Sequence, residues 1–464
     1  MLSSKLLNLL HFESDSKIWD YRDDKGFPLY LMVRYRLLQG MINKRFSLSN
    51  PHLPLSQPLV AVLKYLIKSL VNSPLFIKKK KILIFSSGVV SVKGNDGIFY
   101  NRLYQNFVDQ YPDEVGLIEA SNKRAYSEPK KTKVFYRDLL DIFIFIYSHF
   151  KKPSHIECQT VNDFKDYLSA GRQSDLGADF NKVVLKQISK YRAGYSLYRL
   201  FFSLKKPKLV LVEDASYGGY AYIVKAAQDL GIKVAEYQHG YIGLNHPAYN
   251  FNLDNLPNDI YGFFPSIFLT HGEHWVKNCK VPAEKIAVGY PDLLNRIKIY
   301  GDKSFPKESN SILFISGGTI PEKLSSFIGD FISLNPGSKV YLRPHPSERP
   351  EVKKRYDSLI NKGVIIDVGD LYTVLSASDV VVSFSVSTVL YEAIFFTKKI
   401  YLVDDDYANF YEPNSPFLRF DTPESLTDQI QSEAKIDITP DYFWANNPEQ
   451  RFNDFLQTVL KDSK

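Results

Sequence analysis

The chain has few cysteines and no long hydrophobic run. Only Cys158 and Cys279 occur in 464 residues, which excludes a disulfide framework and makes a reducing cytoplasm the simplest setting. The apolar stretch Ile142–Tyr147 is far shorter than the roughly 20 residues that span a bilayer. Leu6–Leu10 is too short for the apolar part of a signal peptide, and no small-residue cleavage site follows. We therefore expect a cytoplasmic protein.

Positive charge is concentrated at one end of the chain. The net charge is +7, yet the first 81 residues carry 14 Lys/Arg and 5 Asp/Glu, so the remainder is slightly acidic. No basic-aromatic RNA motif and no zinc-finger spacing accompanies the basic segment. The pattern favours an anionic membrane surface, and no nucleic acid, as partner of this segment.

Residues 1–80 predict a basic helical N-terminal extension. The pattern indicates helices over Leu29–Gln39 and Leu59–Val71, and a basic run, Lys78–Lys81, follows. The second helix is apolar with Lys64 and Lys68 on one face. Two arrangements fit it: the helix lies on a membrane surface, at the inner face of the cytoplasmic membrane, or it packs against the rest of the protein.

Residues 81–285 predict a first Rossmann-like domain. Short buried strands at Ile82–Phe85, Leu209–Val212, Ile232–Tyr237 and Ser266–Thr270 each end in polar residues. A helix is expected from about Ile98 after the first strand. Because ligands of parallel sheets bind outside the carboxyl ends of the strands, the polar tips mark the candidate site.

Residues 286–440 predict a second domain of the same kind. Ile286–Pro291 reads as the crossing segment, and strands are expected at Ser311–Ile315, Lys339–Leu342, Asp379–Val382 and Ile400–Val403. Residues 441–464 read as a terminal helix. The fold class is thus α/β, with two doubly wound Rossmann-like domains after a helical extension.

Two motifs of the second domain suit phosphate binding. The strand Lys339–Leu342 runs into a loop that carries Arg343, His345 between two prolines, and Glu348. The strand Asp379–Val382 runs into the hydroxyl-rich loop Ser383–Thr388, which opens a helix whose first backbone N–H groups can bind an anion. A glycine loop after the first strand of this domain lets backbone approach the same ligand. The candidate donor-binding residues are Arg343, His345, Pro346, Glu348, Ser383, Ser385, Ser387, Thr388, Glu392, Gly317, Gly318 and Thr319.

The first domain supplies the candidate catalytic groups. His239 suits a general base near neutral pH, Asp214 is the second candidate, and Glu213 adjoins it. The candidate acceptor contacts are Gln238, His246 and His271. The histidine spacing matches no standard zinc pattern, so no metal and no other cofactor is expected.

In motif order, residues 205–405 resemble GT-B glycosyltransferases. More specifically, the chain resembles bacterial surface-polysaccharide transferases that carry His-Pro and Ser-rich motifs. These include polysialyltransferases, Kdo transferases and teichoic-acid glycerophosphate polymerases. His239-Gly240 is similar to the polymerases' His-Gly, although Gln238 stands where they have Trp. Glu213-Asp214 is similar to the sialyltransferases' acidic pair, with Ala215 in the glycine position.

This resemblance implies an inverting, metal-independent glycosyltransferase. It would move a sugar from a nucleotide-activated donor to a lipid-linked or oligosaccharide acceptor of a capsule, O-antigen or lipooligosaccharide. A CDP-polyol phosphotransferase, a sugar-nucleotide 2-epimerase and a non-catalytic GT-B scaffold stay open as alternatives, because one fold hosts many functions.

Overall fold

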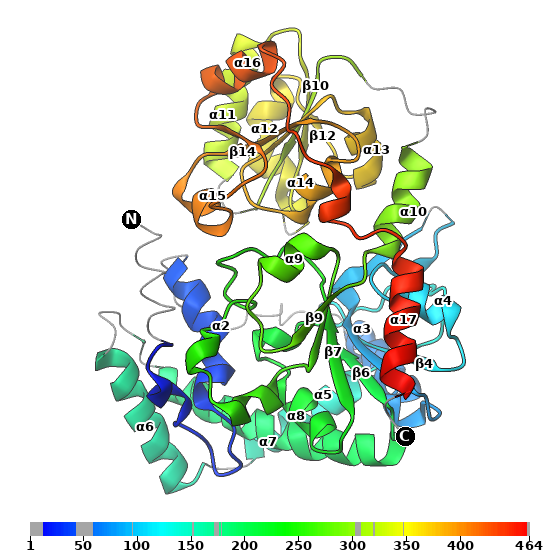
Figure 1. The fold of residues 1–464 in the computed structure, drawn as a ribbon, viewed down its shortest axis with the longest axis vertical. Helices are drawn as coiled ribbons and strands as arrows, with labels where there is room; N and C mark the ends of the chain where they lie inside the picture. The colour runs from blue at the N-terminus through cyan, green and yellow to red at the C-terminus, as the bar shows by residue number, and fades with distance from the viewer. Residues whose placement is uncertain are drawn as a thin grey trace.

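The structure, a computed structural model, describes residues 13–42, 59–94, 96–150, 153–170, 176–177, 179–301, 308–318, 321–346 and 348–461. Two α/β domains lie one above the other, with the first domain below and the second above in Figure 1. The last helix returns from the second domain to lie beside the first.

The first domain is built on a parallel sheet of seven strands in the order β5-β4-β1-β6-β7-β8-β9. Its central strand β6 is apolar and buried along its whole length, and β8 is buried throughout, because helices cover both faces. The strands are β1 (Ile82–Ser87), β4 (Val115–Ala120), β5 (Val134–Tyr136), β6 (Leu209–Val212), β7 (Lys233–Tyr237), β8 (Ile267–Thr270) and β9 (Glu284–Ala287).

The helices of this domain are α4 (Gln105–Gln110), α5 (Asp138–Phe150), α6 (His155–Ala170), α7 (Phe180–Lys205), α8 (Ala221–Gln228) and α9 (Glu273–Lys277). The helix predicted from Ile98 is wrong, because a hairpin of β2 (Ser91–Lys93) and β3 (Phe99–Asn101) occupies that stretch. Asn101 Oδ1 accepts hydrogen bonds from the backbone N–H groups of Leu103 and Tyr104, at 3.1 Å each, and delays the helix to Gln105.

The second domain has a parallel sheet of six strands in the order β12-β11-β10-β13-β14-β15. Its strands are β10 (Ser311–Ile315), β11 (Lys339–Arg343), β12 (Ile365–Ile366), β13 (Val380–Ser383), β14 (Lys399–Val403) and β15 (Leu418–Phe420). Its helices are α11 (Pro321–Leu334), α12 (Val352–Asn361), α13 (Leu371–Ala377), α14 (Thr388–Ala393), α15 (Asp406–Tyr411) and α16 (Pro423–Gln431).

Both sheets have the doubly wound strand order, so each has a point where the winding reverses. That switch point lies between β1 and β6 in the first sheet and between β10 and β13 in the second. The predicted fold class, two doubly wound Rossmann-like domains in the GT-B manner, is confirmed by this topology. Ligands of such sheets bind in the crevice at the switch point.

The segment between the domains is shifted from the predicted one. Ile286 and Ala287 belong to β9, which pairs with β8, so the first sheet continues past the expected boundary at residue 285. The connection runs instead through α10 (Pro291–Tyr300). On the return, α17 (Pro448–Lys461) packs on the first domain, where the Tyr111 hydroxyl donates to Asn453 Oδ1 at 2.5 Å.

Helix α2 (Leu29–Ile42) of the N-terminal extension is part of the folded body. It packs in the same core as α7, and Arg34 is 2% exposed. Arg34 Nε donates to Glu13 Oε1 at 2.5 Å, and its Nη2 donates to the carbonyl of Asn250 at 2.6 Å. One buried cation therefore joins the extension to the loop after β7.

Replacing Arg34 by Met is expected to destabilise the protein by about 3–5 kcal/mol, because Glu13 then remains buried without its counter-charge. Urea unfolding measures the loss. The double variant with Glu13→Gln should recover part of it, whereas Lys81→Met, at the exposed ion pair with Glu114, should cost less than about 1 kcal/mol. Equal costs for Arg34→Met and Lys81→Met would show that the buried pair contributes no more to stability than an exposed one.

Candidate functional site

Two loops of the second domain touch at its switch point. A side chain at Gly317, after β10, would collide with Ser385, after β13, because a Cβ there would lie 2.5 Å from Ser385 Oγ. Gly318 has a positive φ of 75°, which favours glycine, and packs beside the His345 ring. The predicted glycine, His-Pro and Ser-rich loops therefore converge on one place; Thr319 lies outside the described residues.

A buried carboxylate holds this arrangement together. Glu348 is 1% exposed and accepts hydrogen bonds from Ser316 Oγ at 2.7 Å, the His345 backbone N–H at 2.8 Å and the Tyr356 hydroxyl at 2.7 Å. Burial alone would raise the pKa of Glu348, but these donors outweigh it and lower the pKa. Glu348 was predicted to bind the donor; instead it fixes the loop that presents the exposed His345 and Pro346.

Three other predicted donor residues are also engaged by the protein. Arg343 pairs with Asp367 and donates to the Gly369 carbonyl at 3.0 Å, so it neither pairs with Glu348 nor faces the loops. Ser383 is fully buried and donates to the Ser385 carbonyl at 2.7 Å. Glu392 is 5% exposed and accepts from the Tyr372 hydroxyl at 2.7 Å, and burial raises its pKa.

The accessible groups of the Ser-rich motif are at the start of α14. Ser385, Ser387 and Thr388 are half-buried. Ser387 caps the helix, with its Oγ accepting from the Val389 N–H at 3.3 Å. These hydroxyls, together with Gly317, Gly318 and His345, form the part of the predicted donor site that a ligand can reach.

In the first domain, the two leading base candidates form a pair. Asp214 follows β6 and His239 follows β7, and Asp214 Oδ1 lies 3.1 Å from His239 Nδ1. Asp214 adopts a left-handed conformation with φ of 59°, an uncommon geometry for a residue with a side chain. This contact is not a hydrogen bond, because Asp214 Oδ1 is buried without a hydrogen-bond partner among the described residues. The hydrogen bond of His239 Nδ1 is made with the Tyr249 hydroxyl at 3.1 Å, so Asp214 lies beside the ring and Tyr249 holds it.

Two further carboxyl groups lie beneath this pair. Glu213 Oε2 accepts from Ser86 Oγ at 2.6 Å and from the Ser87 N–H at 2.9 Å. Glu236 Oε2 accepts from Ser216 Oγ and N–H at 2.5 and 2.9 Å. Burial raises the pKa of each to about 8. This shift favours the protonated form near neutral pH, and the hydrogen bonds of Glu213 join the end of β6 to the end of β1.

The three predicted acceptor contacts differ in their exposure. Gln238 is fully buried, and its amide donates to the Gly240 carbonyl at 2.9 Å and accepts from the His271 N–H at 2.8 Å. His271 is 2% exposed and packs in one cluster with the rings of Tyr290 and Trp444. Half-buried His246 is the most accessible of the three, and burial lowers its pKa to about 3, so it is neutral.

The two half-sites meet across the domain interface. The Tyr241 hydroxyl, two residues after His239, donates to Glu412 Oε2 at 2.6 Å and to the Tyr411 carbonyl at 2.8 Å. Val386, inside the Ser-rich motif, packs with Tyr241 against the cluster of Leu38, Phe410 and Tyr411. The loop with His239 and the loop with Ser385 and Ser387 therefore lie on opposite sides of one small contact.

Sequence reasoning missed two tyrosines of this site. The Tyr249 hydroxyl lies 3.1 Å from His239 Nδ1 and 3.2 Å from Glu236 Oε1; its place ten residues after His239, in the same loop, was the available signal. Tyr35 comes from α2 and packs on Tyr217 at a ring distance of 4.4 Å. Burial, then the charge of Asp214, raises the pKa of Tyr35 to about 12. Nothing in the sequence near Tyr35 points to this site.

Comparisons with known proteins give a fold similarity alone. No family model and no curated protein matches the chain. Similar solved structures include the UDP-GlcNAc 2-epimerase of Methanocaldococcus jannaschii, with 12% identity over 81% of this chain and 99% of that one and a TM-score of 0.47. MurG of Acinetobacter baumannii has 12% identity over 82% and 99%, with a TM-score of 0.40. The wall teichoic acid polymerase TagF has 10% over 87% and 97%, with a TM-score of 0.44. Scores this low assign no activity to the chain.

Glu236→Gln is expected to remove a pH dependence of stability. The raised pKa means that the folded protein keeps a proton that the unfolded chain releases, so the wild type loses stability as pH rises from about 4.5 to about 8, by up to about 1.4 kcal/mol per pH unit. Thermal unfolding at pH 5 and pH 8 measures it. The variant should equal the wild type at pH 5 and exceed it at pH 8; parallel pH curves would contradict the buried, protonated state.

Proposed function

We propose that the protein is an inverting glycosyltransferase that uses a nucleotide-activated sugar and needs no metal ion. The observation that carries the proposal is the pairing, across one interface, of an Asp214–His239 dyad with the convergent Gly317–Gly318, His345 and Ser385–Thr388 loops. The first is a general base and the second is an anion site built from N–H groups and hydroxyls.

The second domain holds the phosphate of the donor in this proposal. Gly317 and Gly318 let the loops with Ser385 and His345 pack closely together, and the hydroxyls of Ser385, Ser387 and Thr388 donate hydrogen bonds to phosphate oxygens. His345, fixed by Glu348 through its backbone N–H, stabilises the negative charge of the leaving nucleotide. Catalysis on the donor side is then electrostatic and needs no group beyond this chain.

The first domain activates the acceptor. His239 takes the proton of an acceptor hydroxyl while the acceptor oxygen attacks the anomeric carbon from the face opposite the nucleotide. The bond from that carbon to the phosphate oxygen breaks, and its electron pair leaves with the nucleotide. Asp214 stabilises the imidazolium that forms, and Tyr249 keeps the ring in place.

Donor binding and turnover should separate in two histidine variants. His345→Ala is expected to lose the thermal stabilisation given by the donor nucleotide, which is roughly 2.7 kcal/mol at 100 times the dissociation constant. His239→Ala should keep that stabilisation and lose turnover by about 10²–10⁴-fold, the usual contribution of a general base. The measurements are thermal shifts with CMP, CDP, UDP, GDP and dTDP, and sugar transfer with the nucleotide sugar that binds.

The control for both variants is His155→Ala, which removes an exposed imidazole on α6. Near-normal turnover of His239→Ala would contradict the assignment of the base. CMP binding would indicate a sialic-acid or Kdo donor, CDP a polyol phosphate and UDP a hexose. Formation of the C2 epimer from the nucleotide sugar without an acceptor would establish the 2-epimerase alternative. Binding of none of the five nucleotides would favour the non-catalytic scaffold.

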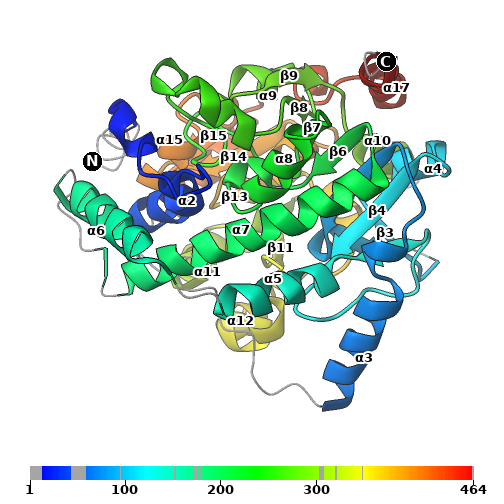
Figure 2. The ribbon, with the colours of Figure 1, turned by 90° about the horizontal axis from the view of Figure 1, so that it is seen from below.

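The proposal includes an acceptor at the inner face of the bacterial cytoplasmic membrane, part of a capsule, O-antigen or lipooligosaccharide. No helix among the described residues is both long and apolar enough to cross a bilayer. Helix α3 (Leu59–Val71) instead presents apolar side chains to the outside and projects beside α5 in Figure 2. The exposed residues are Val60, Leu63, Leu66, Ile67, Leu70 and Val71 on α3, and Phe143, Phe145, Ile146, Tyr147 and Phe150 on α5.

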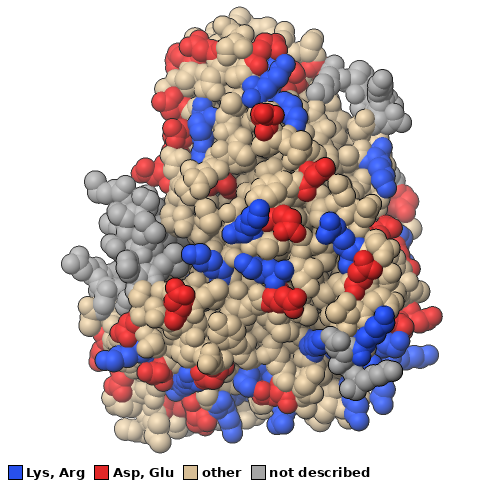
Figure 3. Space-filling model, in the orientation of Figure 1, with Lys and Arg blue, Asp and Glu red and all other residues tan. Residues whose placement is uncertain are grey.

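Charge supports a lipid partner for this α3–α5 surface. Residues 59–81 contain six lysines and no acidic residue. Within the described part of the chain, Lys64, Lys78 and Lys79 form no ion pair, whereas basic and acidic residues are interspersed on the face in Figure 3. Apolar side chains bordered by unpaired lysines fit the interface of an anionic bilayer.

The double variant Leu63→Asp, Ile67→Asp is expected to bind phosphatidylglycerol-containing vesicles at least about tenfold more weakly, because two apolar side chains lose their burial and acids meet anionic lipid. Vesicle co-sedimentation measures it. Leu334→Asp, at an exposed leucine of the second domain, is the matched control. Unchanged binding of the double variant would remove this surface from the proposal.

A further inference from the structure

The candidate base stands at the end of a chain of hydrogen bonds that runs into the core of the first domain. The Tyr249 hydroxyl lies 3.1 Å from His239 Nδ1 and donates to Glu236 Oε1 at 3.2 Å. The other oxygen of Glu236 lies 2.5 Å from Ser216 Oγ and accepts from the Ser216 N–H at 2.9 Å. Glu236 and Tyr249 are fully buried, and Ser216 is 1% exposed. Bulk water therefore does not compete for these contacts.

The Tyr249 hydroxyl carries one proton and lies between His239 and Glu236. If it donates to Glu236 Oε1, its oxygen accepts from His239, and the histidine proton is on Nδ1. If it donates to His239 Nδ1, the histidine proton is on Nε2. The nearby Tyr217 hydroxyl fits either arrangement, because a hydroxyl can donate or accept. Only the first arrangement leaves the Nε2 lone pair free to take a proton from a substrate.

The charge of Asp214 favours the first arrangement. Asp214 Oδ1 lies 3.1 Å from His239 Nδ1 and is buried without a hydrogen-bond partner among the described residues. A lone pair on Nδ1 would face a carboxylate oxygen at this distance, whereas an N–H bond turns its positive end toward it. The proton of the neutral ring therefore belongs on Nδ1, and the Tyr249 hydroxyl accepts from it.

Glu236 can accept from Tyr249 in either of its protonation states. When ionised, it accepts through both oxygens. Burial raises its pKa to about 8, so the protonated form must fit as well. The acid proton fits between Oε2 and Ser216 Oγ, which is the shorter of the two hydroxyl contacts, and the direction of that hydrogen bond then reverses. Oε1 remains a carbonyl oxygen that receives the Tyr249 proton.

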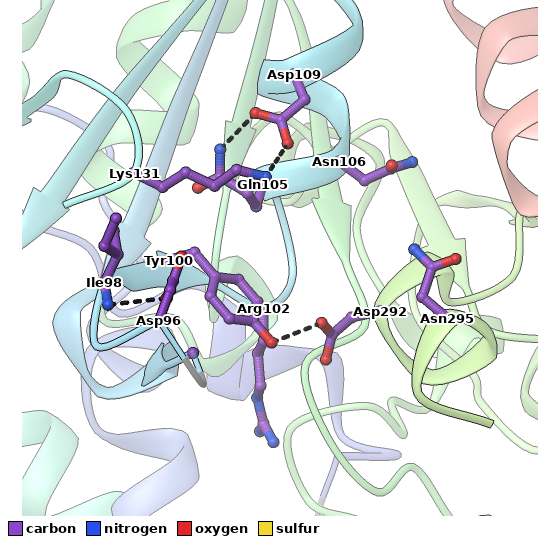
Figure 4. A pocket seen from close by; sticks show the side chains of 11 residues that line it. Asp96, Ile98, Tyr100, Arg102, Gln105, Asn106, Asp109, Lys131, Asp292 and Asn295 are labelled. Atoms are coloured by element: carbon purple, nitrogen blue, oxygen red, sulfur yellow. Dashed lines mark hydrogen bonds and ion pairs between the residues drawn. The ribbon is translucent and has the colours of Figure 1, made fainter. Parts of the chain in front are cut away.

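A second tyrosine of the same domain has this order of donors without ambiguity. Tyr100 lines a polar cavity of about 430 Å³, shown in Figure 4, where its hydroxyl donates to Asp292 Oδ1 at 3.1 Å. Arg296 Nη2 donates to the same hydroxyl at 2.6 Å. Because an arginine has donors only, the Tyr100 hydroxyl must accept from it and give its own proton to the carboxylate. The chain at His239 repeats this order with an imidazole in place of the guanidinium.

We propose that Glu236 is a positioning residue that acts through Tyr249 to keep the proton of neutral His239 on Nδ1, so that Nε2 is the atom that accepts a proton in catalysis. The consequence for catalysis rests on the proposed glycosyl transfer. The position of the proton does not, because the hydrogen bonds and the charge of Asp214 set it before any substrate binds. Asp214 thus acts on Nδ1 through its charge, and Glu236 acts by keeping the Tyr249 oxygen available as an acceptor.

Nitrogen spectra of the full chain locate the proton without any substrate. In histidine labelled with ¹⁵N, long-range ¹H–¹⁵N correlations give a different pattern for each neutral tautomer and for the imidazolium. The chain has nine histidines, and the signal of His239 is the one that His239→Ala removes. Spectra are recorded at about pH 7.5, roughly one unit above the ordinary histidine pKa of about 6.5, and again at about pH 9.

Glu236→Gln is the variant that should reverse the chain. The Ser216 N–H can only donate, so the amide oxygen must take the place of Oε2 and the NH₂ group that of Oε1. This NH₂ group donates to the Tyr249 hydroxyl, which must then donate to His239 Nδ1. In the double variant Glu236→Gln, Tyr249→Phe, the amide no longer reaches the imidazole, so the charge of Asp214 should return the proton to Nδ1.

Glu213→Gln is the matched control for the spectra. Glu213 is also a buried carboxyl with a pKa raised to about 8, but its hydrogen bonds go to Ser86 and Ser87. Its replacement should leave the His239 tautomer as it is in the wild type, so an effect of Glu236→Gln cannot come from the loss of any buried acid.

Neutral His239 of the wild type is expected to have its proton on Nδ1 at both pH values. Glu236→Gln should move the proton to Nε2, and the double variant should move it back. In sugar transfer, Glu236→Gln should lower turnover by about 10²-fold or more, because a protonated Nε2 cannot act as a base. Its thermal shift with the donor nucleotide should equal that of the wild type.

Three results would overturn the inference. A wild-type proton on Nε2, or one that changes nitrogen between the two pH values, would show that Glu236 donates to Tyr249. An unchanged tautomer in Glu236→Gln would show that Glu236 does not act on His239. The wild-type spectra decide even where a variant fails to fold. The expected tautomers without any sugar transfer would support the placement of the proton and refute the proposed reaction alone.

Discussion

The candidate donor site depends on one buried carboxylate, Glu348. Its oxygens accept from Ser316 at the end of β10, from the backbone of His345 and from Tyr356 on α12. These three donors come from β10, from the loop after β11 and from α12, so they converge on Glu348 only if the loop after β11 folds back toward the end of β10. The rigid position of His345 is a consequence, because Glu348 binds its backbone and leaves the imidazole exposed.

The first domain also contains buried carboxyl groups at its candidate site, but there burial favours the uncharged form. Glu348 has enough donors to keep its charge, whereas burial holds Glu213 and Glu236 protonated near neutral pH. An ionised group at either position would add negative charge beside Asp214. Neutral acids under the dyad leave Asp214 as the charge that His239 meets, which suits an imidazole that must accept a proton.

The sequence predicted the central strands β1, β6, β7, β8, β10, β11, β13 and β14 and the polar motifs after them, because these buried strands are apolar runs that polar residues follow. It did not predict β4, β5, β9 and β15. It misjudged residues whose role depends on tertiary neighbours. Arg343 and Glu348 are residue types that often bind ligands, yet here Arg343 pairs with Asp367 and Glu348 accepts a hydrogen bond from Ser316. Tyr35 was not identified, since its position at the site follows from the docking of α2.

The interface between the domains decides how the two half-sites act on one another. Glu412 accepts from Tyr241 of the first domain and from Tyr391 of the second, at 2.6 and 2.7 Å, and burial raises its pKa. Parting the domains would break the Tyr241 hydrogen bond and leave Glu412 with Tyr391 alone, so this contact favours the arrangement of the two domains seen here. Because Tyr241 lies two residues from His239, the same contact positions His239, the proposed base, relative to the Ser-rich loop. In the proposed reaction, this packing would set the separation of the base from the donor phosphate before any substrate binds.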